Sequence, residues 1–203
     1  MTWTYSGAIS ASVDSRKTLL AAALKVLEEK GEAQFSTRAI CAIANVTAPA
    51  LYYHFGNADG LLSAAITEAF RQFLKSKKAA VTSSDPETAL RQGWNDYVRF
   101  AAARPRLYAA MMARVLTGAT IPAAAQGAAL LKERVQAIAA QGRLVPTVES
   151  AADFVFASAN AAALLFVTAR LRGTARPDVA VIDGLREQAM HAIIIPSKKA
   201  RAK

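Results

Sequence analysis

The sequence predicts an all-α protein of about nine helices, and three observations support this fold class. About a quarter of the 203 residues are alanine, the strongest helix former, so the hydrophobic fraction of 53% overstates the size of the core. Only 10 glycines and 7 prolines interrupt the chain. No stretch alternates valine, isoleucine or threonine with polar residues between turn signals, as a strand would. We expect a three-helix amino-terminal head followed by a larger helical region.

The amino-terminal segment divides into an arm and a helix. Residues 1–14 are polar and lack helical periodicity, which predicts a flexible arm. A helix should follow from Ser15 to Lys30, where Gly31 ends it. Apolar residues recur at helical spacing along its inward side: Leu19, Leu20, Ala23, Leu24 and Leu27.

The stretch from Phe35 to Leu62 predicts two short helices joined by a tight turn. In the first helix Ile40, Ile43 and Ala44 fall at helical spacing, and the turn follows at Asn45-Val46. Thr47 is well placed to cap the second helix, which spans Ala48–Phe55 and has only Leu51 and Phe55 as obvious core anchors. This pattern is typical of a helix-turn-helix, whose second helix keeps one face free for a DNA major groove.

The remaining helices follow from turn residues and prolines. Asn57 or Asp59 can start a long apolar helix that links the head to the rest. A polar break at residues 83–87 places a domain boundary near residue 80, which gives domains at 15–80 and 81–195. Five helices should occupy the second domain, at Pro86–Ala103, Pro105–Leu116, Pro122–Gln141, Val148–Arg172 and Pro177–Ile195. Residues 196–203 should form a basic disordered tail.

The helix-turn-helix region resembles a known family. Its sequence pattern is similar to the DNA-binding domain of TetR-family transcriptional regulators. The residues that carry the similarity are Thr37-Arg38, Ile40, Ala44, Val46-Thr47, LYYHF at 51–55 and Leu61-Leu62. The likeness covers Ser15 to about Lys78, and LYYHF after the ANVT turn is its most specific part. Two positions depart from the family pattern. This chain has Asn45 where the family usually has glycine, and Ala58 where the family commonly has lysine.

The resemblance implies a homodimeric regulator, most often a repressor, that binds double-stranded operator DNA. Two half-sites about one helical turn apart, roughly 34–36 Å, would require a pseudo-palindromic operator. The residues that the resemblance places on phosphates are Thr37, Arg38, Tyr52 and His54. Those that it places nearest the bases or the adjoining backbone are Thr47, Ala48, Pro49 and Tyr53.

The second domain is expected to bind a small effector. Aromatic, methionine and polar side chains among its alanines could line a cavity for an apolar or amphipathic molecule. The candidates are Trp94, Tyr97, Met111, Phe154 and Asn160. Each of them could instead fill the core, and that alternative stays open.

The last two helices are expected to form the dimer interface. Small and apolar residues make one stripe on each helix, so that two helices from each subunit would form a four-helix bundle. The stripe consists of Ala159, Ala163, Phe166, Ile182, Leu185, Ala189 and Ile193.

Other classes of protein find little support. The two histidines, His54 and His191, have no partner at metal-ligand spacing, and the sequence contains no phosphate-binding glycine loop and no nucleophile elbow. We therefore expect no enzyme activity, no metal and no cofactor. The single cysteine, Cys41, suits a small core position, and with no visible secretory leader we expect a cytoplasmic protein. The apolar run Phe154–Ala169 is too short and too weak to span a bilayer, which predicts a buried helix and no membrane partner.

Charge leaves a second interpretation open. The net charge is +10, but residues 1–57 hold five basic against four acidic residues, so charge supports an anionic partner only loosely. The alternative is a small-molecule-binding helical dimer without operator DNA binding. Ala58 and the near-neutral head favour it, whereas the intact LYYHF segment opposes it.

Overall fold

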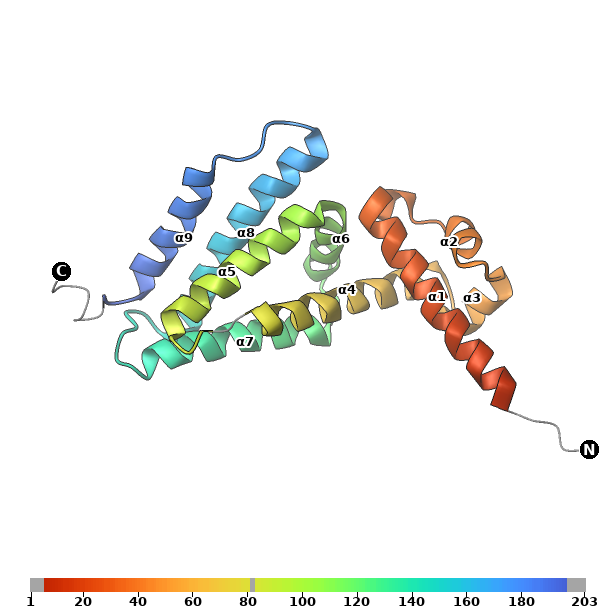
Figure 1. The fold of residues 1–203 in the computed structure, drawn as a ribbon, viewed down its shortest axis with the longest axis horizontal. Helices are drawn as coiled ribbons and strands as arrows, with labels where there is room; N and C mark the ends of the chain where they lie inside the picture. The colour runs from red at the N-terminus through yellow and green to blue at the C-terminus, as the bar shows by residue number, and fades with distance from the viewer. Residues whose placement is uncertain (1–5, 81–82, 197–203) are drawn as a thin grey trace, which may run out of the picture. The chain divides into compact units, whose positions relative to one another are not determined.

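The computed structural model describes residues 6–80 and 83–196, and within them every regular element is helical (Figure 1). Extended pairing in this part of the chain is confined to one bridge between Leu144 and Ile194. The all-α prediction is therefore confirmed. The elements are α1 (Ser6–Lys30), η1 (Glu32–Gln34), α2 (Thr37–Ala44), α3 (Ala48–Phe55), α4 (Ala58–Ala80), α5 (Pro86–Ala103), α6 (Pro105–Leu116), α7 (Pro122–Ala139), α8 (Val148–Arg172) and α9 (Val179–Ile193).

The predicted amino-terminal arm is partly helical in the structure. Helix α1 begins at Ser6 rather than Ser15, so the predicted arm is helical over residues 6–14. After Gly7 this segment contains no glycine or proline, and nothing in it stops a helix from extending towards the amino terminus. Residues 1–5 of the arm and 197–203 of the basic tail lie outside the described residues.

The chain divides into two compact units, and the boundary falls inside α4 rather than near residue 80. The first unit comprises residues 1–70 and 106–120, and the second comprises 71–105 and 121–203. The apolar stripe of α4 continues through Phe70 and Phe73, so the sequence gives no sign of the division. Most of α6 belongs to the first unit, where Arg114 donates to the carboxylate of Asp59 and, at 3.0 Å, to Ser63 Oγ.

The core of the first unit holds the helix-turn-helix. Leu19 and Leu27 of α1, Ile40 of α2 and Leu51 of α3 are completely buried, as is Leu61 of α4. Cys41 is partly buried, and burial raises the pKa of its thiol, which supports the prediction of a small packing residue.

The second unit is a bundle of α5, α7, α8 and α9, in which α5 and α8 make the most extensive contact. The side of α8 that faces the bundle is built from small residues, which let neighbouring helices approach closely. Its buried residues are Ala151, Ala152, Val155, Ala159, Ala162, Ala163 and Val167.

Helix α8 is less buried than the sequence suggested. Among the described residues it alone is long and apolar enough to cross a membrane by length and composition, and 28% of its most apolar window is buried. One side packs against α5, α7 and α9, while Phe154, Leu164 and Leu165 are exposed on another. It is therefore a bundle helix with one uncovered apolar face, and not a fully buried helix.

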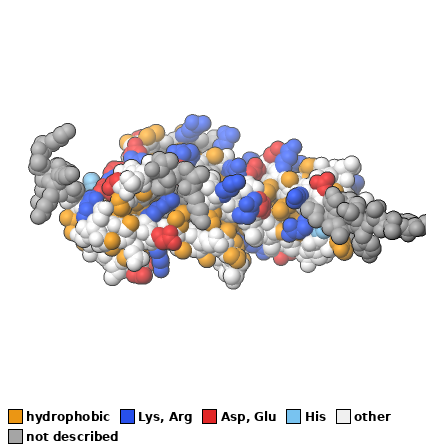
Figure 2. All heavy atoms as spheres, turned by 60° about the horizontal axis from the view of Figure 1, so that its bottom comes forward, with side chains coloured by type: hydrophobic (Ala, Val, Ile, Leu, Met, Phe, Trp, Pro, Cys, Tyr) orange, Lys and Arg blue, Asp and Glu red, His pale blue; other side chains and the backbone are white. Residues whose placement is uncertain are grey.

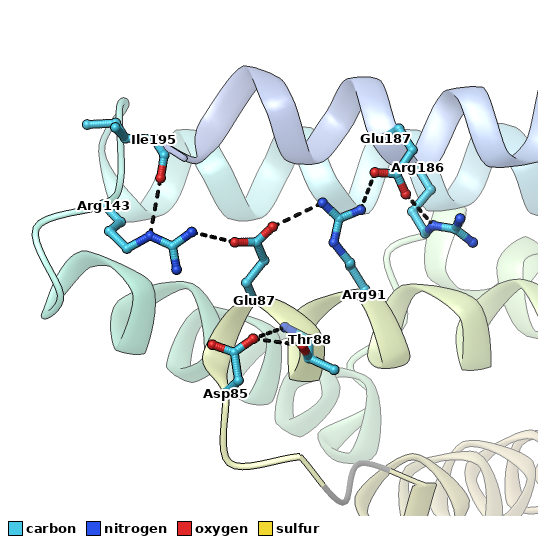
Figure 3. A network of polar contacts seen from close by, with 8 residues as sticks. All are labelled: Asp85, Glu87, Thr88, Arg91, Arg143, Arg186, Glu187 and Ile195. Carbon is cyan, nitrogen blue, oxygen red and sulfur yellow. Dashed lines mark hydrogen bonds and ion pairs between the residues drawn. The ribbon is translucent and has the colours of Figure 1, made fainter. Parts of the chain in front are cut away.

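A network of charged side chains joins the start of α5 to α9 and to the connection between α7 and α8 (Figure 3). Glu87 accepts hydrogen bonds from Arg91, at 3.0 Å, and from Arg143. Arg91 also donates to Glu187 of α9. The Nε of Arg143 donates to the carbonyl of Ile195 at 3.2 Å. Segments far apart in sequence are thereby held at one end of the bundle.

The network fixes the charge of Glu87. Burial acts to raise the pKa of this carboxyl group, but the hydrogen bonds and charges of Arg91 and Arg143 outweigh burial and hold the pKa below its ordinary value. Because the folded-state pKa is depressed, the carboxylate stabilises the fold above its unfolded pKa of about 4.3. That stabilisation is lost as the pH falls through the folded-state pKa.

We expect Glu87→Gln to lower the free energy of unfolding by about 1–2 kcal/mol at pH 7, because two arginines lose a charged partner that is only a quarter exposed. The difference from the unaltered protein should shrink as the pH is lowered from 6 towards 3.5. Urea unfolding at fixed protein concentration measures both effects. Asp153→Asn on the exposed side of α8 serves as the control, and an equal, pH-independent loss in the two variants would contradict the role given to the network.

Candidate nucleic-acid interface

The turn between α2 and α3 depends on the backbone conformation of one residue. Asn45 has φ 52° and ψ 45°, and it is the one non-glycine residue with positive φ in the described part of the chain. Its N–H bonds to the carbonyls of Cys41 and Ala42, and the N–H of Val46 bonds to Cys41 O at 3.1 Å. Asparagine tolerates this left-handed conformation far better than branched residues do, so it can replace the family's glycine.

A single residue anchors α3. Leu51 is its one buried side chain, as Ile40 and Ala44 are the buried residues of α2, with which α3 is in contact. The second predicted anchor, Phe55, is only partly buried. Of the three residues at helical spacing in α2, Ile43 is 46% exposed. Ile43 lies at the outer edge of a two-turn helix whose buried side Ile40 and Ala44 already occupy.

Most of the predicted DNA contacts lie on the surface. Tyr53 is 81% exposed and Tyr52 is half exposed. The others that are exposed are Arg38, Thr47, Ala48 and Pro49, while Thr37 and His54 are partly buried. The His54 ring packs edge-on against Tyr53, with 5.2 Å between ring centroids. The eight residues thus come together around the start of α2 and the outer side of α3.

Thr47 occupies the N-cap position of α3 but does not cap with its side chain. Its backbone is extended and its carbonyl accepts from Leu51 N at 3.2 Å, yet the hydroxyl makes no cap hydrogen bond. The predicted side-chain cap is therefore not formed. The exposed hydroxyl remains at the amino end of α3, where backbone N–H groups and the helix dipole favour an anion.

The junction of α3 and α4 requires a glycine that sequence reasoning missed. A Cβ on Gly60 would lie 2.0 Å from the carbonyl oxygen of Phe55, so only glycine allows the two helices to approach this closely. The N–H of Gly60 bonds to Asn57 Oδ1 at 2.8 Å, which makes Asn57 the residue that starts α4. Ala58, where the family commonly has lysine, is exposed at the first position of α4.

Lysine and arginine side chains occur in both units of the chain, among them Arg16 and Arg114 in the first and Arg99 and Arg170 in the second. Figure 2 shows lysine and arginine side chains interspersed with apolar and acidic ones across the visible face. Near α3, Arg16 lies over the ring of Phe55 at 5.2 Å, and Arg114 pairs with Asp59. Within residues 6–80 and 83–196, no group of three or more histidine, cysteine or carboxylate side chains is placed to hold a metal ion.

The structure brings together three of the five predicted effector-binding residues. The indole N–H of Trp94 donates to Ser158 Oγ at 2.9 Å, and the Tyr97 hydroxyl donates to Asn160 Oδ1 at 2.6 Å. Trp94 and Tyr97 border a cavity of about 20 Å³ between α5, α7 and α8. Hydrogen bonds across the bundle therefore fix the two aromatic rings.

The other two predicted effector-binding residues lie elsewhere. Phe154 is exposed on the outer side of α8, and Phe156 borders the cavity instead. Met111 is buried in the first unit. Sequence reasoning also missed Arg134 of α7, which lines the cavity, because an isolated arginine on a helix gives no sign of burial.

The stripe predicted for the dimer interface faces the core of its own unit. Phe166 and Leu185 are partly buried. The other five residues are buried, namely Ala159, Ala163, Ile182, Ala189 and Ile193. They pack inside the bundle and offer no surface to a second chain. Both helices instead leave their opposite sides uncovered, with Phe154, Ala157, Ala161, Leu164, Leu165, Val181 and Ala192 exposed.

Comparison with known proteins identifies the amino-terminal domain and the fold. Residues 19–65 match the model of the family described as bacterial regulatory proteins, tetR family. No significant match was found among curated proteins.

Solved structures share the fold over most of the chain. A TetR-family transcriptional regulator from Pectobacterium atrosepticum is 24% identical, with a TM-score of 0.71 over 93% of this chain and 98% of its own. A protein of unknown function from Rhodococcus sp. RHA1 is 24% identical, with a TM-score of 0.76 over 89% and 96%. The multidrug binding protein EbrR, complexed with imidazole, is 22% identical, with a TM-score of 0.63 over 90% and 92%.

We expect Asn45→Val to destabilise the first unit by about 1–2 kcal/mol, because a branched residue resists the left-handed conformation, and Asn45→Gly to be neutral or slightly stabilising. Thermal and urea unfolding measure the change. Ala42→Val, inside α2 at negative φ, is the control and should cost less than about 0.7 kcal/mol. An equal loss in Asn45→Gly and Asn45→Val would mean that the asparagine side chain, and not the backbone conformation, holds the turn.

Proposed function

Because residues 19–65 form a TetR-family DNA-binding domain, we propose that this chain is a homodimeric transcriptional repressor controlled by a small-molecule effector. Each subunit would place α3 in a major groove of a pseudo-palindromic operator, with half-sites about 34–36 Å apart. The effector would bind in the second unit and change the affinity for DNA.

The outer side of α3 carries this proposal. A buried aromatic side chain would contribute to packing, but Tyr53 is almost fully exposed and Tyr52 is half exposed. Hydroxyl groups on this surface suit phosphate oxygens, which position a protein on DNA without reading its sequence. Ala48 and Pro49 offer only apolar contacts, for instance to a thymine methyl group. Operator specificity would therefore depend partly on DNA shape.

The uncovered sides of α8 and α9 support a dimer. Leu164 is 55% exposed and Val181 is 51% exposed, and small residues such as Ala161 lie between the larger ones. Two copies related by a two-fold axis could bury these sides against each other as a four-helix bundle. The dimer would thus use the opposite sides of the two helices from the stripe predicted by the sequence.

Effector control rests on the second unit. One structure with the same fold is described as a multidrug binding protein complexed with imidazole, which supports a ligand site in folds of this kind. In this chain the cavity beside Trp94 and Tyr97 is the candidate. A coupling of about 1–3 kcal/mol would change DNA affinity roughly 5- to 150-fold.

Titration with the DNA that flanks its own gene tests the proposal. Fluorescence anisotropy should give salt-sensitive binding of one dimer to a symmetric site, and a reporter placed behind that DNA should be expressed more strongly when the protein is absent. A stable dimer that binds none of this DNA would favour the alternative of a ligand-binding dimer without an operator.

We expect Tyr52→Phe to weaken operator binding by about 1–3 kcal/mol for the two subunits together, because each loses one hydrogen bond to a phosphate. Arg38→Gln should also weaken binding and reduce the salt dependence by up to about one ion per subunit, whereas the neutral Tyr52 hydroxyl should leave that slope nearly unchanged. Lys25→Gln, on the exposed side of α1, is the matched charge control. Unchanged affinity in Tyr52→Phe would remove this residue from the interface.

We expect Leu164→Glu to convert the dimer to a folded monomer, because it places charges at the centre of the proposed interface without touching the core. Ala189→Glu should instead unfold the protein, since Ala189 is buried within its own chain. Sedimentation and circular dichroism distinguish the two outcomes. Ala129→Glu, at an exposed position of α7, is the control, and a normal dimer in Leu164→Glu would place the interface elsewhere.

A further inference from the structure

A groove in the second unit lies where α5 and α8 end (Figure 1). It has a volume of about 600 Å³ and is lined by the end of α5, the end of α8 and the connection from α8 to α9. Among the described residues, it shares none with the cavity beside Trp94 and Tyr97, and none of the exposed residues assigned to the dimer lines it. The groove is therefore a separate site, and its volume suits a small molecule.

Three arginines from different segments line this groove. Arg99 belongs to α5, Arg170 to the last turn of α8, and Arg176 to the connection that follows. Gly173, with φ 67°, ends α8 in a left-handed conformation and turns the chain, so that Arg176 reaches the groove. No carboxylate is among the described residues of the lining. Positive charges gathered without a negative one attract an anion.

The carboxylates closest in sequence to these arginines are engaged. Asp96 Oδ1 accepts from Arg99 at 2.9 Å, but the Arg99 side chain is 74% exposed, so one nitrogen is held and the others stay accessible. Asp178 caps α9, where its Oδ1 accepts a backbone N–H at 2.8 Å. Arg170 and Arg176 form no ion pair with any residue that the structure describes. All three guanidinium groups can therefore contact a ligand.

Helix polarity accounts for only one of the three arginines. A cation in the last turn of a helix is stabilised by the partial negative charge there, which suffices to explain Arg170. Arg99 lies before the last turn of α5, and Arg176 lies outside every helix of the described chain. Helix stability therefore does not explain why these two arginines lie in the same groove as Arg170.

The rest of the groove is largely apolar. Its uncharged lining consists of Ala102, Ala103, Phe166, Ala169, Gly173, Thr174 and Pro177. The Thr174 hydroxyl donates to the carbonyl of Ala169 at 3.5 Å. A ligand that fills the groove would therefore place apolar surface against the alanines and Phe166, and its charge among the arginines.

We propose that the groove binds a phosphate ester with an apolar body. A phosphate monoester carries about −1.5 to −2 charge at pH 7, and its oxygens accept paired hydrogen bonds from guanidinium groups. Several guanidinium groups can therefore contact one phosphate, whereas a sulfate ester offers a single charge. The apolar body would lie against Phe166 and the alanines. This site goes beyond the proposed function and depends on neither operator binding nor the effector cavity.

Calorimetric titration of the full chain without DNA tests the proposal. The probes are 1-naphthyl phosphate, 1-naphthyl sulfate and 1-naphthol, which share one apolar body and differ in charge. We expect the phosphate to bind about tenfold more tightly than the sulfate, and the sulfate more tightly than the naphthol. Inorganic pyrophosphate lacks the apolar body and should bind more weakly than 1-naphthyl phosphate. Equal affinities across the naphthyl series, or equal affinities for pyrophosphate and the ester, would overturn the proposal.

The double variant Arg170→Gln with Arg176→Gln removes two charges at exposed positions of the groove. It should lower the affinity for 1-naphthyl phosphate about tenfold or more, keep the affinity for 1-naphthol, and leave the melting temperature nearly unchanged. The matched control is Lys75→Gln with Lys132→Gln, which removes two exposed charges from α4 and α7 of the same unit. A phosphate preference that persists in the arginine variant, or one that is lost equally in the lysine variant, would contradict the site.

The pH dependence gives a readout that a purely structural role of the arginines would not change. As the pH falls from 7.5 to 5, a phosphate monoester takes up a proton near its second pKa of about 6 and loses one charge. Its affinity should therefore fall severalfold, whereas the affinity for the sulfate ester should stay constant. The described lining contains no histidine and no carboxylate, so the change reports on the ligand. A phosphate affinity that does not change with pH would rule out recognition of the dianion.

A lipid headgroup presents the same phosphate chemistry at a membrane surface. Co-sedimentation with phosphatidylcholine vesicles that contain phosphatidic acid separates this source from a soluble ester. We expect the arginine variant to reduce vesicle binding no more than the lysine variant does, because the apolar body of a lipid stays in the bilayer and cannot fill the groove. Vesicle binding that requires Arg170 and Arg176, without binding of 1-naphthyl phosphate, would overturn the proposal.

Discussion

The geometry of the DNA-binding surface depends on burying one leucine. An eight-residue helix is not stable alone in water, and Leu51 is the only side chain of α3 that enters the core. The helix is therefore also fixed at its ends, by the left-handed Asn45 before it and by the close approach of Gly60 to Phe55 after it. With its ends held by the backbone, the remaining side chains of α3 are free to serve an external surface.

Communication between the two units has few covalent routes. The chain passes from one unit to the other at residues 70–71, 105–106 and 120–121. The first crossing lies inside the continuous helix α4, and the second adjoins the start of α6. A continuous helix can pass a displacement from one unit to the other as a rigid rod. A flexible linker would not transmit the displacement. Any coupling between an effector and DNA would still require that the ligand bind one arrangement of the units better than another.

The sequence predicted the helices well because their limits are set locally. Prolines, glycines and capping residues place the ends of α3, α5, α6 and α8 at the predicted residues. The LYYHF segment also identified the exposed surface of α3, since few apolar residues remain there once Leu51 is buried.

The side of each helix that packs against the core could not be predicted from the sequence alone. Phe154 and Phe156 are equally apolar, and only the packing of α8 on α5 decides which one borders the cavity. The apolar stripe on α8 and α9 forms the core of its own unit, and apolar spacing alone does not distinguish a core from a dimer interface. A Cβ on Gly93 of α5 would lie 2.0 Å from Arg134 Nη1 of α7, a proximity that neither residue indicates in the sequence.

Helix α8 has small residues inside and larger ones outside, which reverses the usual arrangement. Alanines let it lie close to its neighbours, while Leu164 and Leu165 stay about half exposed to water. Completing their burial would contribute about 1 kcal/mol for each leucine. If a second chain covers that side, stability becomes linked to protein concentration. Phe154 and Phe156 are two residues apart, about 200° around the helix. An effector in the cavity that Phe156 borders would therefore lie beside the same turn of α8 that a partner would contact through Phe154. Ligand binding and dimer geometry would then be coupled over a single helix diameter, without a long chain of intermediate contacts.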